Sequence, residues 1–468
     1  MPTILGANTL SSGFDVANSL MFNDDDSAYL NKTPAGDGSR VKWTWSGWVK
    51  RCSFGHQPIF ATPGNSSNIY DEFYFNSTDK IQYSAVVSGT QYALRTKRKF
   101  RDTNAWYHIV LIVDSNNGTA GDRMQLWING VRTPEADMED TTFKDAQNYS
   151  TATNKASYVT YLGRVSTNTA AYFDGYMAEV VFQNDNADSP VDKFGEFDED
   201  SGIWKPIDVS GLTLGTNGFY LDFEDSSDLG NDAAGSNNWS SNNLAATDQM
   251  TDTPTNNFAT MNPLDNFYAS STFAEGNLKI TTNASNQTFN TGTIGLSTGK
   301  WYWEAKLVQA GGEEAIGITD IDSTGTGIYG GKTANNYSFK GNNGDIRNND
   351  SNSSYGSAYA EDSIVGVFMD LDNNKLYFAV DGTLQNSGTG HSITAAASTT
   401  NGVYFPMVGD VDSDSVIWEC NFGSPTFAIS SGNTDGEYGN FEYTTTITGD
   451  SVSKTFKAIN TKNLAEFG

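Results

Sequence analysis

Cysteine and histidine are scarce in this chain. Its two cysteines, Cys52 and Cys420, are too few for a disulfide-built scaffold or for a zinc site of the cysteine type. Its three histidines, His56, His108 and His391, are far apart and show no metal-binding spacing. No Ser/His/Asp or Cys/His arrangement is visible. The sequence therefore offers no nucleophile with its base, and we predict no catalytic residue.

Positive charge is also in short supply. The chain has 28 Lys and Arg against 56 Asp and Glu, which gives a formal net charge of −28 at pH 7. Nucleic acids and anionic membrane surfaces require basic patches, so neither is an expected partner. We attribute the acidity mainly to solubility and to aspartates in turns, where the side chain bonds nearby backbone.

Long apolar stretches are missing as well. No run approaches the length of a membrane span, so we expect no membrane insertion. The start, MPTILGANTL, has neither a basic region nor an apolar core as long as that of a signal peptide. We therefore expect synthesis in a cytosol without export by the usual route.

The last absence is a helical pattern, because no segment keeps apolar residues at three- and four-residue spacing. Aromatic residues instead make up 13% of the chain, and Gly, Asn, Ser, Thr and Asp separate short apolar runs. Such regular punctuation is typical of a β-sandwich or barrel. At 468 residues the chain is too long for one ordinary core. The sequence predicts an all-β protein of two or three domains.

Two hairpins of the same plan lie in different halves of the chain. In residues 364–384, apolar residues alternate on both sides of a polar turn, and Asp381-Gly382 closes the second strand. An earlier alternating strand ends at Asn129-Gly130 in the same way. Both dipeptides favour a type I′ turn because they tolerate positive φ. We predict that these turns set strand register in two similar sheets.

Changes in composition divide the chain into five parts. Residues 226–266 are rich in Asn, Asp and Ser, which favours disorder, but anchors such as Trp239 fit a clamped linker equally well. The predicted parts are an N-terminal arm (1–18), a first sandwich (19–225), an irregular connector (226–266), a second sandwich (267–425) and C-terminal strands (426–468).

The two sandwiches resemble known modules. The blocks WTWSGWVKR, AWYHIVLIVD, MQLWING and FDGYMAEVVF resemble, in that order, a laminin G-like/concanavalin A-like jelly roll. GKWYWEAKL, AIGITD and IVGVFMDLDNNKLYFAVDGTL resemble a SPRY domain, itself a concanavalin-like sandwich. The resemblance implies two tandem concanavalin A-like antiparallel jelly rolls. Four tryptophans on their strands are interpreted as core rather than as ligand sites: Trp43, Trp45, Trp301 and Trp303.

The combination of modules resembles structural proteins of tailed phages, especially marine ones. That resemblance implies a virion protein assembled in the host cytoplasm, such as a tail fibre, head fibre, spike or decoration appendage. The partners it implies are other virion proteins and a host-cell glycan or receptor. It also implies a homo-oligomer, with a trimer favoured, anchored by the arm or by the C-terminal tail. A purely architectural capsid or tail protein is an alternative.

A polysaccharide-degrading spike is the other alternative. Glycoside hydrolysis generally needs two carboxylates a defined distance apart. Concanavalin-like glucanases place theirs on one strand as E-x-D-x-E, and no such strand occurs here. Glu179 and Glu304 are lone acids among apolar neighbours, so we interpret both as hydrogen-bonded structural carboxylates. His108, in an apolar strand, is likewise interpreted as a satisfied core residue.

A glycine-rich loop, residues 321–360, supplies the candidate ligand-binding residues. It carries Tyr329, Tyr337, Tyr355 and Tyr359. Tyrosine offers a sugar an apolar face and a hydroxyl group at low entropic cost. The alternative, which we prefer, is that these rings pack the loop onto its own sandwich or onto a neighbouring subunit.

Two acidic runs are weak candidates for calcium, and no other cofactor is expected. Asp24, Asp25 and Asp26 form one run, and Asp370 and Asp372 belong to the other. Both offer the oxygen ligands that calcium prefers. Neither fits the twelve-residue calcium loop, and acidic turns are common in such a composition. We therefore commit to no metal site.

Overall fold

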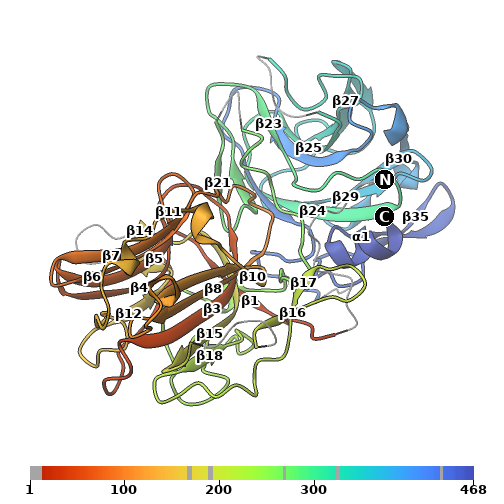
Figure 1. Cartoon of the computed structure of the whole chain (residues 1–468). Helices are drawn as coiled ribbons and strands as arrows, with labels where there is room; N and C mark the ends of the chain where they lie inside the picture. The colour runs from red at the N-terminus through yellow and green to blue at the C-terminus, as the bar shows by residue number, and fades with distance from the viewer. Residues whose placement is uncertain (1–12, 166–170, 188–192, 267–269, 322–326, 433–435) are drawn as a thin grey trace. The chain divides into compact units, whose positions relative to one another are not determined.

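The computed structural model describes residues 13–165, 171–187, 193–266, 270–321, 327–432 and 436–468. In this part of the chain α1 (Thr461–Phe467) is the one α-helix, and strands dominate the rest. The chain divides between Thr255 and Asn256 into two units, which run from red to green and from green to blue in Figure 1. The predicted all-β class is confirmed. No helix among the described residues is long and apolar enough to span a membrane.

The first unit contains two sheets of eight strands each. The first sheet has the order β10-β9-β8-β3-β15-β1-β20, with β18 beside β15. Its strands are β1 (Ser19–Phe22), β3 (Lys42–Arg51), β8 (Tyr107–Asp114), β9 (Met124–Ile128), β10 (Val131–Arg132), β15 (Gly175–Asn184), β18 (Phe219–Leu221) and β20 (Gln249–Met250).

The second sheet of this unit has the order β11-β7-β6-β5-β4-β12-β2-β19. Two small sheets, β13-β14 and β16-β17, accompany the large ones. The strands are β2 (Tyr29–Lys32), β4 (Gln57–Ser66), β5 (Ile69–Phe75), β6 (Ile81–Val87), β7 (Thr90–Thr96), β11 (Met138–Asp140), β12 (Thr160–Leu162), β13 (Arg164–Val165), β14 (Ala171–Tyr172), β16 (Gly195–Phe197), β17 (Trp204–Pro206) and β19 (Ser240–Asn242).

The second unit repeats this plan with one sheet of nine strands and one of six. The larger sheet has the order β21-β22-β34-β24-β29-β30-β31, with β32 beside β30 and β37 beside β24. Its strands are β21 (Thr272–Ala274), β22 (Lys279–Thr281), β24 (Lys300–Gln309), β29 (Ile364–Asp370), β30 (Lys375–Val380), β31 (Thr383–Leu384), β32 (His391–Ser392), β34 (Ile417–Asn421) and β37 (Lys457–Ala458).

The smaller sheet of the second unit has the order β23-β33-β25-β26-β27-β28, and the separate hairpin β35-β36 lies in the C-terminal part. These strands are β23 (Thr288–Thr291), β25 (Glu314–Thr319), β26 (Tyr337–Lys340), β27 (Asp345–Asn348), β28 (Ser351–Ser354), β33 (Phe405–Asp410), β35 (Thr446–Gly449) and β36 (Val452–Thr455).

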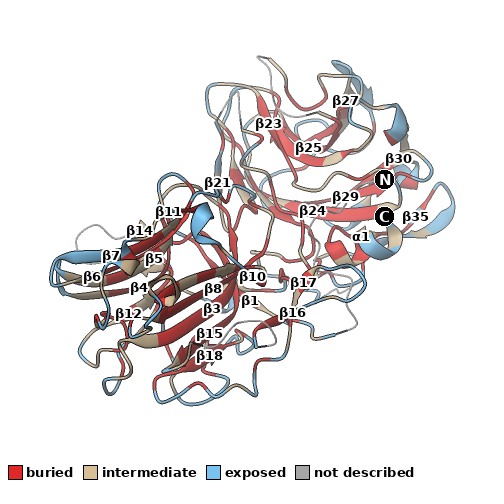
Figure 2. Ribbon diagram, viewed as in Figure 1, coloured by how far each residue is buried: buried red, intermediate tan, exposed pale blue. Residues whose placement is uncertain are grey.

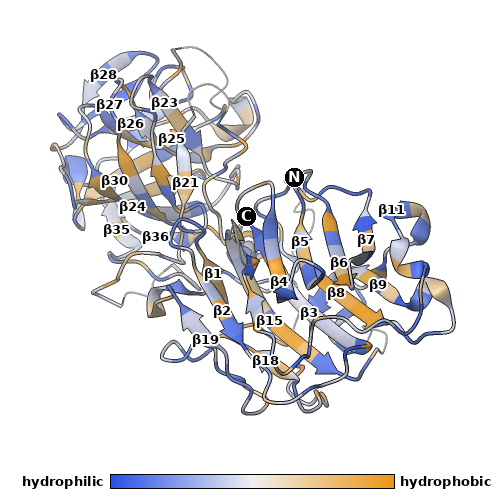
Figure 3. Ribbon diagram, turned by 90° about the vertical axis from the view of Figure 1, so that its left-hand side faces the viewer, coloured by the Kyte–Doolittle hydropathy of each residue, from blue (hydrophilic) through white to orange (hydrophobic). Residues whose placement is uncertain are grey.

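The central strand of each unit is buried on both faces, as the red strands β3 and β24 show in Figure 2. On β3, Trp43 and Trp45 are fully buried and face the aromatic side chains of the opposite sheet, where Phe73 packs edge-on against Trp45. Trp48 points to the other face of the same strand and is also buried. Figure 3 shows the apolar character of the inner strands, with β8 and β25 in orange. The core assignment of the tryptophans on β3 is confirmed.

Both predicted turns are present. Asn129 and Gly130 have φ of 48° and 74°, and Asp381 and Gly382 have φ of 47° and 74°. In each case the flanking residues pair directly, so each loop has two residues and positive φ at both. That geometry is the one a type I′ hairpin requires. The predicted hairpins are therefore confirmed.

The domain boundaries differ from those predicted. Most of the supposed connector belongs to the first unit, because β19 pairs with β2, β20 pairs with β1, and Trp239 is buried against Phe219 at 4.9 Å between ring centroids. The C-terminal strands belong to the second unit, where Phe441 and Phe456 are buried in a cluster with Tyr302. Residues 1–12 of the predicted arm lie outside the described residues.

The Asn129-Gly130 turn offers a test of this fold. An alanine at position 130 would have to keep the positive φ of the glycine, and its β-carbon would lie 2.2 Å from Cε3 of Trp204. A β-carbon at Gly118, in contrast, would meet no atom within 4 Å. We expect Gly130→Ala to lower the free energy of unfolding of the first unit by roughly 1–3 kcal/mol. Gly118→Ala should change it by less than about 0.5 kcal/mol. Denaturant unfolding followed by tryptophan fluorescence measures both, and equal midpoints for the two variants would contradict this account of the turn.

Candidate functional site

The four tyrosines proposed as ligand-binding are buried. Tyr329, Tyr337, Tyr355 and Tyr359 are between 4% and 7% exposed. Three of their hydroxyl groups have protein partners, namely Asp350, Thr394 and the carbonyl of Phe339. Part of their loop forms the strands β26, β27 and β28 of the second unit. In this structure the rings have a packing role, and they present no common surface on which a sugar could stack.

The acidic runs proposed for calcium lie in turns and make local contacts. Asp26 accepts a hydrogen bond from Asn23 at 2.9 Å, next to the exposed Asp24 and Asp25. Among the described residues, no three His, Cys, Asp or Glu side chains stand together as a metal site.

In the second run, Asp370 is fully buried and forms an ion pair of 2.8 Å with Lys454. Asp372 lies 2.6 Å from Lys300. Lysine ammonium groups thus neutralise both carboxylates, which leaves these positions as structural turn residues in the present structure.

Glu179 is a buried, hydrogen-bonded carboxylate, as predicted. It lies at an irregularity of β15, with φ of 50°, and its Oε2 accepts a hydrogen bond of 2.8 Å from the hydroxyl of Tyr220. Burial, as the main cause, raises the pKa of Glu179 to about 8. The nearby carboxylates of Asp222, Glu224 and Asp208 raise this pKa further.

Glu304 and His108 are also satisfied inside the protein. Glu304 accepts hydrogen bonds from the Tyr302 hydroxyl, the Asn421 amide and a backbone N–H, and burial raises its pKa to about 7. The Nδ1 of His108 accepts from the indole of Trp204 at 3.0 Å, and burial lowers its pKa to about 3. His108 is therefore neutral, with Nε2 left to bond Ser46 at 2.9 Å. The prediction that all three groups are hydrogen-bonded inside the protein is confirmed.

An open cleft of about 450 Å³ occurs at one edge of the first unit. One wall is the chain that follows β7, and the other is the β9-β10 hairpin with the segment after it. The cleft combines apolar side chains with basic ones, and its lining residues are Thr96, Lys97, Arg98, Phe100, Ile128, Val131, Arg132, Thr133, Pro134 and Asp137.

The basic wall of this cleft comes from a segment unlike the rest of the acidic chain. The sequence RTKRKFR, residues 95–101, places five basic side chains within seven residues. Arg95 is paired with Glu139 at 3.2 Å and Arg101 with Asp79 at 2.7 Å. In the described part of the protein, Arg98 has no carboxylate partner.

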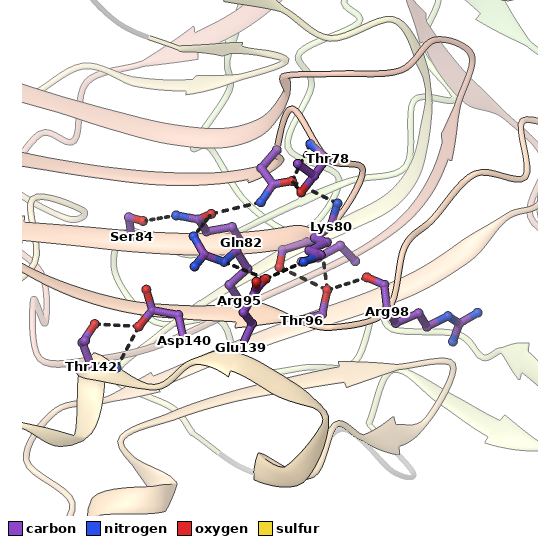
Figure 4. A network of polar contacts seen from close by, with 12 residues as sticks. Thr78, Lys80, Gln82, Ser84, Arg95, Thr96, Arg98, Glu139, Asp140 and Thr142 are labelled. Atoms are coloured by element: carbon purple, nitrogen blue, oxygen red, sulfur yellow. Dashed lines mark hydrogen bonds and ion pairs between the residues drawn. The ribbon is translucent and has the colours of Figure 1, made fainter.

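Arg98 is held by aromatic rings instead. Its guanidinium lies 4.8 Å from the centroid of Phe100 and 5.8 Å from that of Tyr107. Figure 4 shows Lys80 and Arg95 converging on Glu139 while the guanidinium of Arg98 extends away from that network. Stacking leaves the edge N–H groups of a guanidinium free for an anion. The cleft can therefore hold a ligand that combines an apolar face with a carboxylate, sulfate or phosphate.

The sequence analysis did not identify this cleft. The signal was present as a basic run in a chain with a net charge of −28. What the run alone does not show is which of its side chains are already paired. That depends on Glu139 and Asp79, which lie elsewhere in the sequence.

The comparisons with known families agree with the two predicted modules. Residues 23–188 match the concanavalin A-like lectin/glucanases superfamily, and residues 300–419 match the SPRY domain. The cleft lies within the first match. Domains of these two kinds indicate binding of carbohydrate or protein, and they typically bind rather than catalyse. No curated protein matches the chain.

Two solved structures show distant likenesses to this chain. The SPRY domain of human HERC1 has 12% identity and a TM-score of 0.26, over 34% of this chain and 96% of that one. A heptameric SAP-like pentraxin from Limulus polyphemus has 15% identity and a TM-score of 0.28, over 37% of this chain and 79% of that one. At these scores neither likeness supports a statement about function.

The buried Glu179 predicts a pH dependence of stability. Its pKa is about 8 in the folded unit against an ordinary value of 4.5, so between these values the folded state keeps a proton that the unfolded state has lost. The contribution of Glu179 to the free energy of unfolding is fully present below pH 4.5 and is lost as the pH rises through 8. We expect wild type to lose roughly 3 kcal/mol more than Glu179→Gln between pH 5 and 8, at about 1.4 kcal/mol per pKa unit.

Denaturant unfolding of the first unit at a series of pH values measures this loss. Glu199→Gln is the matched control, because it removes an exposed carboxylate of the same unit. Its profile should follow that of wild type. Parallel profiles for wild type and Glu179→Gln would refute the raised pKa.

Proposed function

We propose that this chain is a non-catalytic component of a tailed-phage virion that binds an anionic carbohydrate of the host surface. The binding site is the cleft of the first unit. The observation that carries the proposal is the guanidinium of Arg98, which is stacked on Phe100 and free of any carboxylate partner among the described residues. The sugar-binding role of the four buried tyrosines is set aside in favour of this cleft.

Electrostatics favour an anionic ligand at this position. A chain with a net charge of −28 repels an acidic polymer over most of its surface, so contact needs a local concentration of positive charge. Lys97 and Arg98 line the cleft and supply that charge, whereas Arg132 of the lining is paired with Asp122 at 2.6 Å. Guanidinium groups bind carboxylate, sulfate and phosphate through paired N–H donors.

The apolar part of the cleft suits a sugar ring. Val131 is 59% exposed at the cleft, Pro134 lies on the same side, and Phe100 is buried beneath the basic segment. Sugar rings present C–H faces that pack on apolar side chains while their polar groups reach the surrounding donors. A carboxylated or sulfated polysaccharide satisfies both halves of this surface.

The lining also favours binding over cleavage. Asp137 is the one carboxylate among the lining residues, whereas glycoside hydrolysis generally needs two. A polysaccharide-degrading spike remains the alternative to be tested on the same material. A purely architectural role would leave the unpaired Arg98 without an explanation.

The virion part of the proposal rests on the resemblance of the sequence blocks to tailed-phage structural proteins, and the two family matches bear on the fold and on binding. A fibre, spike or decoration appendage would carry the chain as a homo-oligomer, with a trimer favoured, among other virion proteins. Immunogold labelling of purified particles with an antibody to this chain tests the location, and unlabelled particles would contradict it.

Exchange of one arginine tests the cleft. We expect Arg98→Ala to weaken binding of alginate, a carboxylated polysaccharide, about tenfold, since loss of one charge-assisted contact is worth roughly 1.5 kcal/mol. Arg95→Ala is the matched control, because it removes the same charge from the same segment at a side chain already paired with Glu139. Biolayer interferometry at low and at moderate salt measures both.

Three outcomes separate the alternatives. Neutral dextran should bind neither variant nor wild type, and binding of alginate should weaken as salt is raised. Equal losses of alginate affinity in Arg98→Ala and Arg95→Ala would show that overall charge controls binding, and would contradict the cleft as the binding site. Release of reducing ends from alginate by wild type would replace the binding role with a catalytic one.

A further inference from the structure

Two buried carboxylates belong to paired residues at one end of the smaller sheet of the second unit. Asp410 ends β33 and Glu314 begins β25, and the two residues are direct partners across the antiparallel pair. Their side chains therefore project from the same face of the sheet. Asp410 is fully buried and Glu314 is 3% exposed. Oδ2 of Asp410 and Oε2 of Glu314 are buried oxygens without a hydrogen-bond partner in the described structure.

The loop after β33 brings two further carboxylates to this end. The sequence reads DVDSD, so Asp412 and Asp414 follow Asp410 at two-residue intervals. The backbone N–H of Asp412 donates to Oδ1 of Asp410 at 2.8 Å, and that of Asp414 donates to Oδ1 of Asp412 at 3.3 Å. Each of these bonds occupies one carboxylate oxygen and leaves Oδ2 for another partner.

A glycine in the facing loop places two of these oxygens together. A β-carbon at Gly312 would lie 2.6 Å from Oδ2 of Asp412 and 3.3 Å from Oδ2 of Asp414. Both oxygens thus border the same small space beside the Gly311-Gly312 turn that leads into Glu314. Asp412 and Asp414 thus lie beside the turn that leads into Glu314, at the end of the sheet where Asp410 is buried.

No protein cation neutralises this group. Within the described residues, no Lys, Arg or His forms an ion pair with any of the four, and Lys340 on the neighbouring strand is paired with Glu313 instead. Burial, followed by the effect of Asp412, raises the pKa of Asp410 to about 9, and burial raises that of Glu314. Unpartnered buried carboxylates are costly, so a cation or shared protons must compensate them.

We propose that Glu314, Asp410, Asp412 and Asp414 bind a calcium ion. The ligands are all carboxylate oxygens, with no His or Cys, which disfavours zinc and copper. Calcium accepts six to eight oxygens in flexible geometry, whereas magnesium demands a near-ideal octahedron. The four side chains do not yet meet at one point, because no three acidic groups in the described residues stand as a ready metal site. Binding would draw the loop of Asp412 and Asp414 onto the buried pair.

The proposal concerns different residues from the acidic runs considered in the sequence. Asp370 and Asp372 already have lysine partners, and the carboxylate of Asp26 bonds Asn23. Asp410 and Glu314, in contrast, combine deep burial with an oxygen that has no hydrogen-bond partner in the described structure. The site is also independent of the cleft in the first unit, so failure of one proposal leaves the other standing.

Calcium titration of the full chain tests the site. After treatment with EDTA and exchange into chelator-free buffer, isothermal titration calorimetry should detect one equivalent of bound calcium. Thermal unfolding should shift upward by several degrees when calcium reaches about a hundred times its Kd, because only the folded unit binds it. Magnesium at the same concentration should give a smaller shift.

Variants assign the binding to these residues. Asp414→Asn and Asp412→Asn lie on the exposed side of the site and should fold, yet weaken calcium binding at least tenfold. Asp25→Asn, an exposed aspartate of the first unit, is the matched control and should bind as wild type does. Absence of both heat and thermal shift in wild type would overturn the proposal and assign a shared proton to Asp410. Loss of binding in Asp25→Asn alone would place the ion elsewhere and overturn it as well.

Discussion

Burial of one central strand on both of its faces is the constraint on which each unit depends. In the first unit Trp43 and Trp45 fill the space between the sheets, and Trp48 fills the opposite face of the same strand. Removing a buried tryptophan costs roughly 3–5 kcal/mol, a large part of the stability of an ordinary domain. A strand that is apolar on both faces requires a third layer of chain to cover it.

That third layer explains why both units extend beyond their sandwiches. A cluster that includes Val181, Phe194 and Val209 covers the outer face of the first sheet in the first unit. In the second unit Phe441 and Phe456 cover the outer face formed by β24, β29 and β30. Polar side chains on those faces are then buried and need hydrogen-bond partners inside the protein. Glu179, Glu304 and His108 are such groups, so burial by the covering layer accounts for their displaced pKa values.

Sequence periodicity was sufficient to predict the all-β architecture but not the domain boundaries. The two type I′ turns and the core tryptophans follow from local chemistry, since positive φ and two-residue alternation depend on neighbours in the chain. The covering segments have little periodicity, because each contributes a few anchors such as Trp239 to a face that another part of the chain builds. Their polar composition therefore resembled a connector. The burial of the four loop tyrosines could not be predicted from the sequence either, because a tyrosine in a glycine-rich loop has the same local sequence pattern whether it is packed or exposed.

Sites were harder to predict than strands because they depend on which charges remain unpaired. Arg95 and Arg98 are near neighbours in one basic run, yet a glutamate distant in sequence occupies the first and leaves the second free. Asp370 and Asp410 are both fully buried aspartates at strand ends, yet Lys454 neutralises only the former. Since the sandwich interiors and outer faces are filled by packing, unpaired charge survives at sheet edges and in the loops at strand ends. Those are the positions at which a ligand can replace the missing partner, so pairing, more than residue type, distinguishes a functional charge from a structural one in this protein.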